Sequence, residues 1–211
     1  MLSAGKLKNQ LPLKISLEHN MHNLSHYVRV YDDVFDADFC NGLIELFDYE
    51  NKPTSQVMRT SDHRWEEDYR HFREMDITKA PAFGQFIKPY YDRIAQVYDH
   101  YKSVVDNPFF PHHHAFEDAR MKKYEANDKD QFGWHIDVGD KPSASRFLVM
   151  FAYLNDVEEG GLTRFQSEVD FTVKPKQGRI VIFPPMFMYP HIGEKPVSGP
   201  KYIISTYVHY V

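Results

Sequence analysis

The side chains whose types and spacing could support chemistry begin at His135 and Asp137, within the segment Phe132-Gly133-Trp134-His135-Ile136-Asp137. If this segment is a strand, residues two apart project from the same face, so one imidazole and one carboxylate converge. With a second histidine they would form the 2-His-1-carboxylate facial site that is typical of non-haem Fe(II) proteins. The pair alone is weak evidence, because a chain with 12 His and 30 Asp or Glu contains such pairs by chance.

A second histidine and a lysine lie downstream of this pair. His191 follows the apolar run 178–185, which begins with Gly and ends with Pro and therefore predicts a buried strand that leads into a turn. Lys201 lies ten residues beyond His191 and begins another β-rich apolar run, 201–208. A buried ammonium needs a counter-charge. We therefore expect a dicarboxylate ligand to pair with Lys201.

The composition excludes several functional classes. The chain has 211 residues, which suits one domain with a sizeable core, and its formal net charge of −5 offers no basic field for nucleic acid or for a membrane surface. Its apolar runs are too short for a membrane span, and residues 1–10 lack the apolar core of a signal peptide. Cys40 is the only cysteine, so a reducing compartment fits and we predict a cytoplasmic location. The oligomeric state stays open.

The elements that must position these side chains divide the chain into two parts. We predict a flexible segment over residues 1–24 and a single domain over 25–211. Within this domain, 25–105 is expected to form a helical support region, and 106–211 is rich in short β-branched and aromatic segments that predict a sandwich or barrel. The candidate strands of the second part are 117–125, 132–138, 146–154, 163–166, 170–173, 179–183 and 201–210.

The support region carries its own signals. The alternation at 27–31 predicts a strand, and Asp36 is the expected N-cap of a helix over 37–49. A second helical pattern covers 82–102, where Pro89 predicts a kink or a break. Between the two helices, residues 51–73 are polar and charged, which predicts a long surface loop that could cover a site.

The downstream half of the chain resembles the 2-oxoglutarate- and Fe(II)-dependent dioxygenases, in particular their prolyl 4-hydroxylase-like branch. The resemblance covers roughly residues 116–210, with a fainter similarity at 34–44. It implies a mainly β fold with N-terminal helices, namely a double-stranded β-helix of the jelly-roll or cupin-like type. The shared marks are His135-x-Asp137, Tyr153-Leu154-Asn155 with an acidic loop and Gly160-Gly161-x-Thr163-x-Phe165 after it, the strand Gly178 to Phe183, and His191 followed after nine residues by Lys201.

The resemblance also implies the ligand sites. His135, Asp137 and His191 match the iron ligands, and Lys201 matches the basic residue that holds the distal carboxylate of 2-oxoglutarate. The cofactors implied are Fe(II), 2-oxoglutarate as cosubstrate and O2, with ascorbate as an added reductant. Further residues that match positions of the cosubstrate pocket are Tyr124, Tyr153, Thr163 and Ser205.

The substrate is predicted to be a peptide or protein. Arg146 matches an arginine that faces the peptide groove of prolyl hydroxylases, and Tyr207 stands where that branch often has a tryptophan. Trp134 fits either core packing or a pocket wall. Residues 51–73, with Trp65, Tyr69 and Phe72, could fold over a bound peptide as a lid.

The residue types agree with this chemistry independently. Two neutral imidazoles and one carboxylate leave an Fe(II) site at net charge +1, which attracts an anionic chelator, and three facial ligands leave three positions open. Oxidative decarboxylation would release succinate and CO2 and hydroxylate a bound C–H group. The alternatives are the same chemistry on another side chain or a small molecule, a non-catalytic β-helix binding module, and a zinc hydrolase. The hydrolase would have no use for Lys201.

Overall fold

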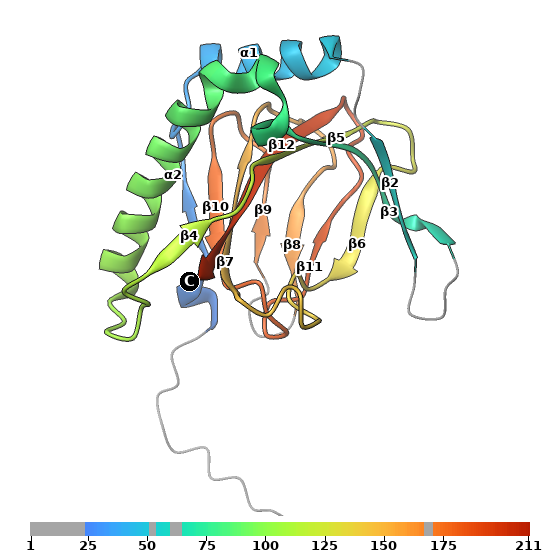
Figure 1. Ribbon diagram of the computed structural model, residues 1–211. Coiled ribbons are helices and arrows are strands. Elements are labelled where there is room, and N and C mark those ends of the chain that lie inside the picture. Colours follow the sequence, from blue (N-terminus) through green and yellow to red (C-terminus); the bar gives the residue numbers. More distant parts are fainter. Residues whose placement is uncertain (1–23, 51–53, 60–64, 167–170) are drawn as a thin grey trace, which may run out of the picture.

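Antiparallel strands form one curled sheet in the computed structural model, which describes residues 24–50, 54–59, 65–166 and 171–211, with the backbone alone for 54–59 and 65–69 (Figure 1). The predicted double-stranded β-helix is confirmed. The helices are α1 (Ala37–Tyr49) and α2 (Gly84–Val105), with short 3-10 turns at η1 (Leu24–Tyr27), η2 (Ile77–Lys79) and η3 (Pro81–Phe83). The strands are β1 (Arg29–Tyr31), β2 (Thr54–Arg59), β3 (Trp65–Asp76), β4 (His114–Phe116), β5 (Arg120–Tyr124), β6 (Gln131–His135), β7 (Arg146–Tyr153), β8 (Thr163–Phe165), β9 (Thr172–Val173), β10 (Ile180–Phe183), β11 (His191–Gly193) and β12 (Lys201–Tyr210).

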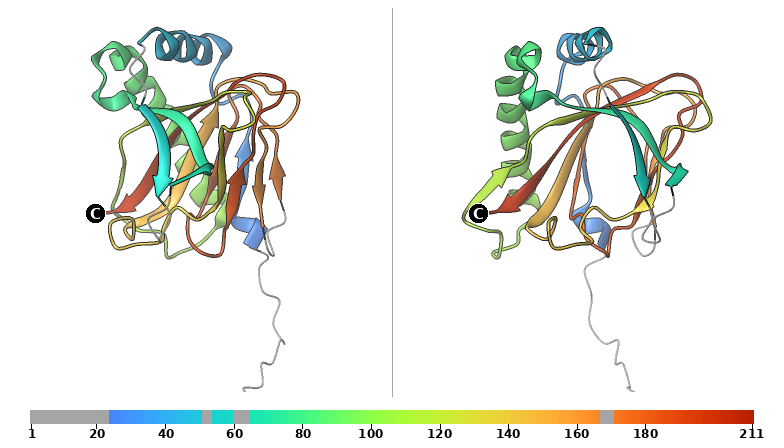
Figure 2. Two further views of the ribbon diagram at one scale, coloured as in Figure 1. Left: turned by 90° about the vertical axis from the view of Figure 1, so that its right-hand side faces the viewer. Right: turned by 45° about the vertical axis from the view of Figure 1, so that its right-hand side comes forward.

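The sheet bends back on itself, so that its two halves face each other. Its strand order is β1-β10-β7-β12-β5-β3-β6-β11-β8-β9, with β2 paired to β3 and β4 paired to β12. Although β7 and β8 lie far apart in this order, the Tyr153 hydroxyl donates a hydrogen bond to Thr163 Oγ1 at 2.6 Å across the interior. Two further views show the open barrel that results, with α2 against its outer face (Figure 2).

Strand β7 shows why these residues form a buried strand. Its sequence RFLVMFAY is β-branched and aromatic, and all of its residues after Arg146 are buried, as expected for a strand covered on both faces. Leu148, Met150 and Ala152 pack into the cluster under the helices, whereas the alternate residues Val149, Phe151 and Tyr153 pack inside the barrel. The period of two thus directs Tyr153 toward the interior.

The first predicted helix is confirmed. The carboxylate Oδ1 of Asp36 accepts a hydrogen bond from the Phe39 backbone N at 2.8 Å, which satisfies one of the free donors at the start of α1. Cys40, Leu43 and Phe47 are buried on one face. This face packs α1 against the sheet and the start of α2.

The second helix differs from its prediction at Pro89. Helix α2 continues through this residue from Gly84 to Val105 without a break. Pro89 lies in the second turn, so the missing N–H removes only one hydrogen bond near the helix start. The buried side chains of Tyr90, Ile94 and Tyr98 hold the following turns against the sheet, and this packing outweighs the local defect.

The predicted surface loop over 51–73 is wrong in its described parts. Strands β2 and β3 form a hairpin there, and β3 pairs with both β5 and β6. The polar and charged sequence shows no strand pattern, so it was predicted to be a loop. The strands form because backbone hydrogen bonds join them to strands that are distant in sequence. Residues 51–53, 60–64 and the side chains of Trp65 and Tyr69 lie outside the described residues, so the lid remains a prediction.

Smaller differences concern element boundaries. The strand expected at 27–31 is shortened to β1 because η1 precedes it, and the strand expected at 117–125 is β5 alone. Strand β11 was missed, because three residues are too few for a periodic pattern. The flexible segment predicted over 1–24 lies outside the described residues except for Leu24.

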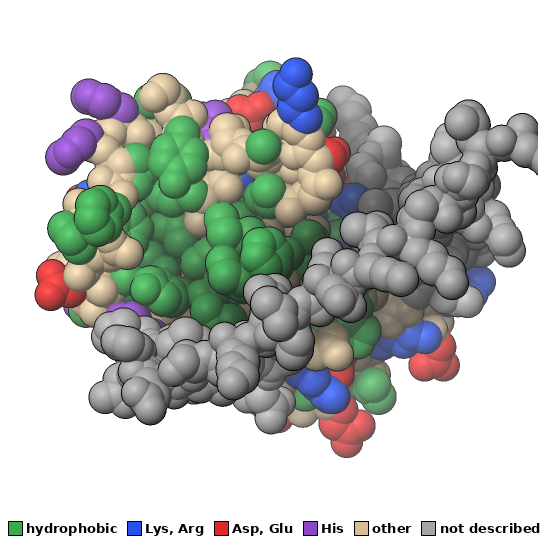
Figure 3. All heavy atoms as spheres, turned by 90° about the horizontal axis from the view of Figure 1, so that it is seen from below, with side chains coloured by type: hydrophobic (Ala, Val, Ile, Leu, Met, Phe, Trp, Pro, Cys, Tyr) green, Lys and Arg blue, Asp and Glu red, His purple; other side chains and the backbone are tan. Residues whose placement is uncertain are grey.

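The lower face of the molecule carries an apolar hollow. Seen from below, hydrophobic side chains gather around it (Figure 3). Phe109 and Tyr210 at its edge are 90% and 55% exposed. Other residues of its wall are Tyr27, Phe110, Phe147, Pro184, Met186 and Met188. Among the described helices, none has the length and the apolar character needed to cross a membrane.

Candidate active site

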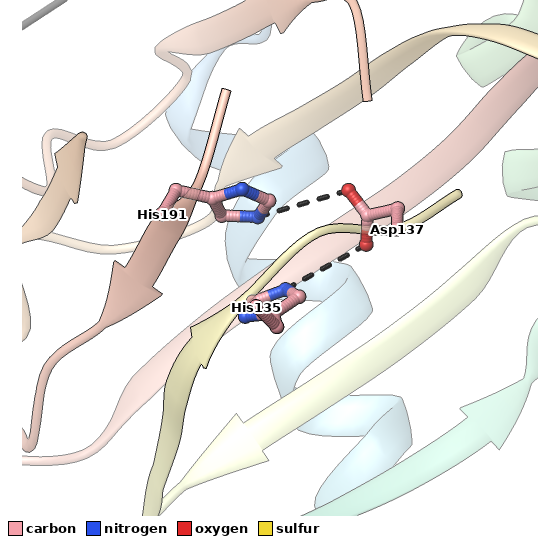
Figure 4. Close-up of side chains that lie close together, drawn as sticks. All are labelled: His135, Asp137 and His191. Carbon is pink, nitrogen blue, oxygen red and sulfur yellow. Dashed lines mark ion pairs between the residues drawn. The ribbon is translucent and has the colours of Figure 1, made fainter. Parts of the chain in front are cut away.

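Backbone pairing brings two histidines together that are distant in sequence. His135 at the end of β6 is the cross-strand partner of His191 at the start of β11. Asp137 lies in the loop after β6 rather than on the strand, contrary to the prediction that both residues share one strand face. Its position is set by the loop, since the backbone N of Asp137 donates a hydrogen bond to Pro185 O at 3.0 Å. The three side chains point toward one another (Figure 4).

The three side chains present their ligand atoms to one point. The Nε2 atoms of His135 and His191 lie 3.6 and 3.7 Å from the two carboxylate oxygens of Asp137. One possible ligand atom from each residue falls within 4.8 Å of the others, as in a set that can hold a metal ion.

The histidine tautomers suit this arrangement. Nδ1 of His135 lies 2.8 Å from Gly133 O, and Nδ1 of His191 lies 3.1 Å from Tyr189 O. Because a carbonyl oxygen can only accept, both Nδ1 atoms carry the proton, and the lone pair is left on Nε2. Such backbone partners orient metal-binding histidines.

The state of the Asp137 carboxylate also fits a cation. Its Oδ1 accepts a hydrogen bond from the Tyr207 hydroxyl at 2.9 Å. Its Oδ2 is buried and has no hydrogen-bond partner in the described part of the chain. A buried carboxylate oxygen without a partner is costly, and a divalent ion between it and the two Nε2 atoms would supply the missing partner. The donor set of two imidazoles and one carboxylate is the one that Fe(II) takes in facial sites.

The protonation states are those that metal ligands need. Burial, together with the neighbouring His135, lowers the pKa of His191 to about 4, so its imidazole is neutral at pH 7. Burial by itself raises the pKa of Asp137, but the contacts with His135, His191 and Tyr207 outweigh it. The pKa of Asp137 therefore lies well below its ordinary value, and the carboxylate is ionised.

Lys201 lies at the deep end of the same pocket. It is 2% exposed, and its Nζ donates hydrogen bonds to Gly161 O and Glu194 O, both at 3.1 Å. Its ammonium also lies 4.4 Å from the ring centre of Tyr124. Burial lowers the pKa of Lys201 to about 7. The Glu194 carboxylate opposes this shift, but it pairs with Arg164 at 2.6 Å, so the Lys201 ammonium is still suited to an anionic ligand.

The other predicted cosubstrate residues lie around this lysine. Tyr124 is the cross-strand partner of Lys201, and Tyr153, Thr163 and Ser205 line the same pocket. Burial raises the pKa of both tyrosines, which therefore remain phenols that can donate hydrogen bonds. The structure thus brings the iron-ligand candidates and the cosubstrate candidates into one cavity.

Tyr207 contacts Asp137 of the candidate metal-ligand triad and Arg146 stacks on Tyr207, whereas Trp134 does not line the pocket. The guanidinium of Arg146 makes two hydrogen bonds to the Glu117 carboxylate, at 2.6 and 2.7 Å, and stacks 3.9 Å from the ring centre of Tyr207. Part of its donor capacity is therefore already used within the protein. Trp134 is 40% exposed.

Two residues of the site were missed by sequence reasoning. Phe132 stacks on the His135 ring with ring centres 3.4 Å apart, and Lys122 lines the pocket beside Ser205. Lys122 lies two residues before Tyr124 on the same strand. The strand period that placed Tyr124 inside therefore also places Lys122 inside, and this signal could have identified it.

Comparison with known proteins agrees with this geometry. Residues 119–209 match the family model described as the 2OG-Fe(II) oxygenase superfamily. The resemblance to these oxygenases is confirmed. The family description implies Fe(II), 2-oxoglutarate and O2, whereas ascorbate stays a prediction. A search of curated proteins finds no sequence that matches the chain.

Several solved structures share the fold. A viral collagen prolyl hydroxylase from Paramecium bursaria Chlorella virus-1, in complex with 2OG, aligns with a TM-score of 0.63 at 20% identity over 88% of this chain and 97% of its own. A Pseudomonas putida prolyl-4-hydroxylase gives 0.63 at 18% identity, over 88% and 94% of the two chains. A Trichoplax adhaerens prolyl hydroxylase, in complex with a peptide of the hypoxia inducible factor, gives 0.66 at 15% identity, over 87% and 84%. At these identities the likeness concerns the fold.

Proposed function

We propose that this protein is an Fe(II)- and 2-oxoglutarate-dependent dioxygenase that hydroxylates a proline in a peptide or protein. The observation that carries the proposal is the convergence of His135, Asp137 and His191 in one pocket with the buried Lys201. A zinc hydrolase would need the triad alone. A buried lysine that faces the same cavity calls for an acidic ligand in addition to the metal.

Each residue has a distinct task in this proposal. His135 and His191 offer their Nε2 atoms to the metal, and Asp137 offers the buried Oδ2. Lys201 binds the distal carboxylate of the cosubstrate as a point charge, with the Tyr124 ring beside its ammonium. Iron, when bound, supplies the redox chemistry that couples decarboxylation of 2-oxoglutarate to hydroxylation of a C–H bond. The aromatic and aliphatic walls exclude water from this chemistry.

A peptide substrate is supported by the surroundings of the triad. Pro184 belongs to the wall of the apolar hollow, and the neighbouring Pro185 accepts the backbone N–H of Asp137. The hollow therefore borders the metal-ligand loop. An extended proline-containing peptide is already close to its bound shape, so ordering it costs little. Arg146 would donate its remaining N–H groups to peptide carbonyls.

The reaction can be tested directly. The protein is incubated with Fe(II), 2-oxoglutarate, ascorbate and a panel of proline-rich peptides, and products are analysed by mass spectrometry. We expect succinate and a mass gain of one oxygen on proline, both lost in Arg146→Ala. Succinate formed with small molecules but never with peptides would contradict the peptide substrate and leave the dioxygenase chemistry standing.

The ligand assignment has a separate test. Asp137→Ala removes the only carboxylate of the triad, and Fe(II) affinity measured by anaerobic titration should fall roughly hundredfold or more. Asp92→Ala is the matched control, since Asp92 is an exposed residue of α2 that pairs with Lys88 on the surface. Unchanged iron affinity in Asp137→Ala would show that the assignment is wrong.

A further inference from the structure

A second buried lysine faces the cosubstrate pocket. Lys122 is 8% exposed and lines the same cavity as Lys201. Along β5 it lies opposite Ile203, whereas Tyr124 lies opposite Lys201. Strand β12 runs from Lys201 toward Tyr207, whose hydroxyl contacts the triad. Lys122 is therefore closer to the candidate metal ligands than Lys201 is. The difference is two residues along the strand, or about 7 Å.

The contacts of Lys122 leave part of its hydrogen-bonding capacity unused. Its Nζ donates to Ser205 Oγ at 3.3 Å, and the carboxylate of Glu74 lies 3.7 Å away, beyond hydrogen-bond distance. Glu74 is shared with Arg120, whose guanidinium lies at 3.4 Å. An ammonium carries three donors. Lys122 thus uses one of these donors in a hydrogen bond with a described residue, and its nearest carboxylate, Glu74, is shared with Arg120.

Lys122 and Lys201 both line this cavity. A pocket with two buried lysines on one wall is suited to a ligand with two anionic groups. The carboxylates of a five-carbon diacid lie about 5 Å apart, which is comparable to the step between the two positions on the strands. Ser205, which accepts the hydrogen bond of Lys122, is itself a predicted cosubstrate residue.

We propose that Lys122 is a second anion-binding residue of this pocket, which takes a carboxylate oxygen at the metal-ligand end of a 2-oxo dicarboxylate. The identity of this ligand rests on the proposed function. Lys201 then recognises the distal carboxylate of the cosubstrate and Lys122 the carboxylate next to the keto group. The residue is a specificity determinant for 2-oxo acids, and its role is separate from metal ligation.

Two ligands distinguish the tasks of the lysines. Dissociation constants are measured by calorimetry on the Fe(II)-loaded protein without O2, for 2-oxoglutarate and for 2-oxopentanoate, which lacks the distal carboxylate. Lys122→Met should weaken both ligands by a similar factor of about ten or more. Lys201→Met should weaken 2-oxoglutarate and leave 2-oxopentanoate nearly unchanged. Lys123→Met is the control, because Lys123 points to the other face of β5 and pairs with Asp48.

The outcomes separate this inference from the proposed function. If the parent protein shows no metal-dependent binding of either acid, the function and the inference both fail. If the parent binds both acids and Lys122→Met binds them equally well, only the inference is overturned. Weakening of 2-oxoglutarate alone would assign Lys122 to the distal carboxylate and would also overturn it.

A folding control keeps the test decisive. Lys122→Met leaves Glu74 buried without its neighbour, so the double variant Lys122→Met/Glu74→Gln removes both charges together. Thermal unfolding identifies which variants are folded. Lys122→Arg keeps the charge and should retain more affinity for both acids than Lys122→Met, a difference that a purely structural role of Lys122 does not predict.

Discussion

At the residue scale, the hydroxyl of Tyr207 contacts one oxygen of Asp137, and the other oxygen has no hydrogen-bond partner among the described residues and is the proposed metal ligand. The ring of this tyrosine is also held under the Arg146 guanidinium. The resemblance to the prolyl hydroxylase branch implies that Tyr207 stands at a position where tryptophan is frequent. Tyrosine and tryptophan can each donate a hydrogen bond from an aromatic side chain. A tyrosine at this position therefore keeps a donor, although the donor atom lies at a different distance from the backbone.

Tyr207→Phe tests this contact. The variant keeps the ring and loses the hydroxyl, so Asp137 should be oriented less firmly, and we expect Fe(II) affinity to fall about 10-fold to 100-fold. Anaerobic iron titration measures the effect. Tyr202→Phe loses a hydroxyl that bonds Asp48 outside the pocket and should leave iron affinity unchanged. Equal affinity in Tyr207→Phe and the parent would contradict the orienting role.

The low pKa of Lys201, about 7, predicts a pH dependence for cosubstrate binding. Only the protonated ammonium pairs with a carboxylate. Below pH 7 the lysine is already charged, whereas above pH 7 binding must take up a proton and affinity for 2-oxoglutarate should fall about tenfold per pH unit. Calorimetry at pH 8 in buffers of different ionisation enthalpy should reveal this uptake.

Lys201→Arg provides the matched control for the pH series. Its guanidinium stays charged over the whole range, so the affinity of this variant should not depend on pH between about 6 and 9. A parallel decline in the variant and the parent would assign the pH dependence to a group other than Lys201.

At the scale of elements, the turn before β10 connects the N-terminal region to the sheet. Gly178 has φ +76°, and a Cβ there would lie 2.1 Å from Phe35 O. Its carbonyl accepts a hydrogen bond from the Val34 backbone N at 3.0 Å, while its own N–H donates to Tyr153 O at 2.9 Å. The turn therefore holds the approach to α1 and the end of β7 in register.

Gly178→Ala should destabilise the fold by about 1–3 kcal/mol or more, because the side chain meets a backbone oxygen and the left-handed conformation is strained. Urea denaturation measures the change in the free energy of unfolding. Gly84→Ala is the control, since nothing lies within 4 Å of its Cβ position at the start of α2. Similar stability of Gly178→Ala and the parent would contradict the strain.

At the scale of the whole molecule, the pocket joins strands from both halves of the curled sheet. Its walls include Tyr153 of β7, Lys201 of β12, Tyr124 of β5, Thr163 of β8 and His191 of β11. A metal and a dicarboxylate bound there bridge strands that belong to opposite halves. Both ligands would bind the folded state alone, because the unfolded chain does not bring these residues together.

Ligand binding should therefore stabilise the entire domain. With Fe(II) present and 2-oxoglutarate at about 100 times its dissociation constant, linkage predicts about 2.7 kcal/mol of added stability. For a chain of this size, the melting temperature should rise by roughly 5 to 10 °C. Differential scanning calorimetry without O2 measures this shift, and a metal chelator should abolish it. An unchanged melting temperature would contradict ligand binding at the site.

Much of the fold and site was predictable from local pattern. The period of 3.6 predicted α1 and most of α2, because burying one face of a helix imposes that period on a sequence. Short apolar runs rich in β-branched and aromatic residues predicted the buried strands β7, β10 and β12. The spacing of His135, Asp137, His191 and Lys201 identified the candidate site. Few types of side chain can bind iron and a dicarboxylate. The presence of two histidines, an aspartate and a lysine at this spacing therefore indicates such a site before the fold is known.

Only the tertiary structure decided how the distant residues meet. The polar segment around β3 became a central strand because β5 and β6 supply backbone partners that no local pattern reveals. The pairing of His135 with His191 depends on β11, whose three residues are too few to show a period. The register of β5 with β12 sets Lys122 opposite Ile203, two residues along the strand from Lys201. Strand register and the curl of the sheet arise from contacts between residues far apart in the chain, which the sequence read along its length does not display.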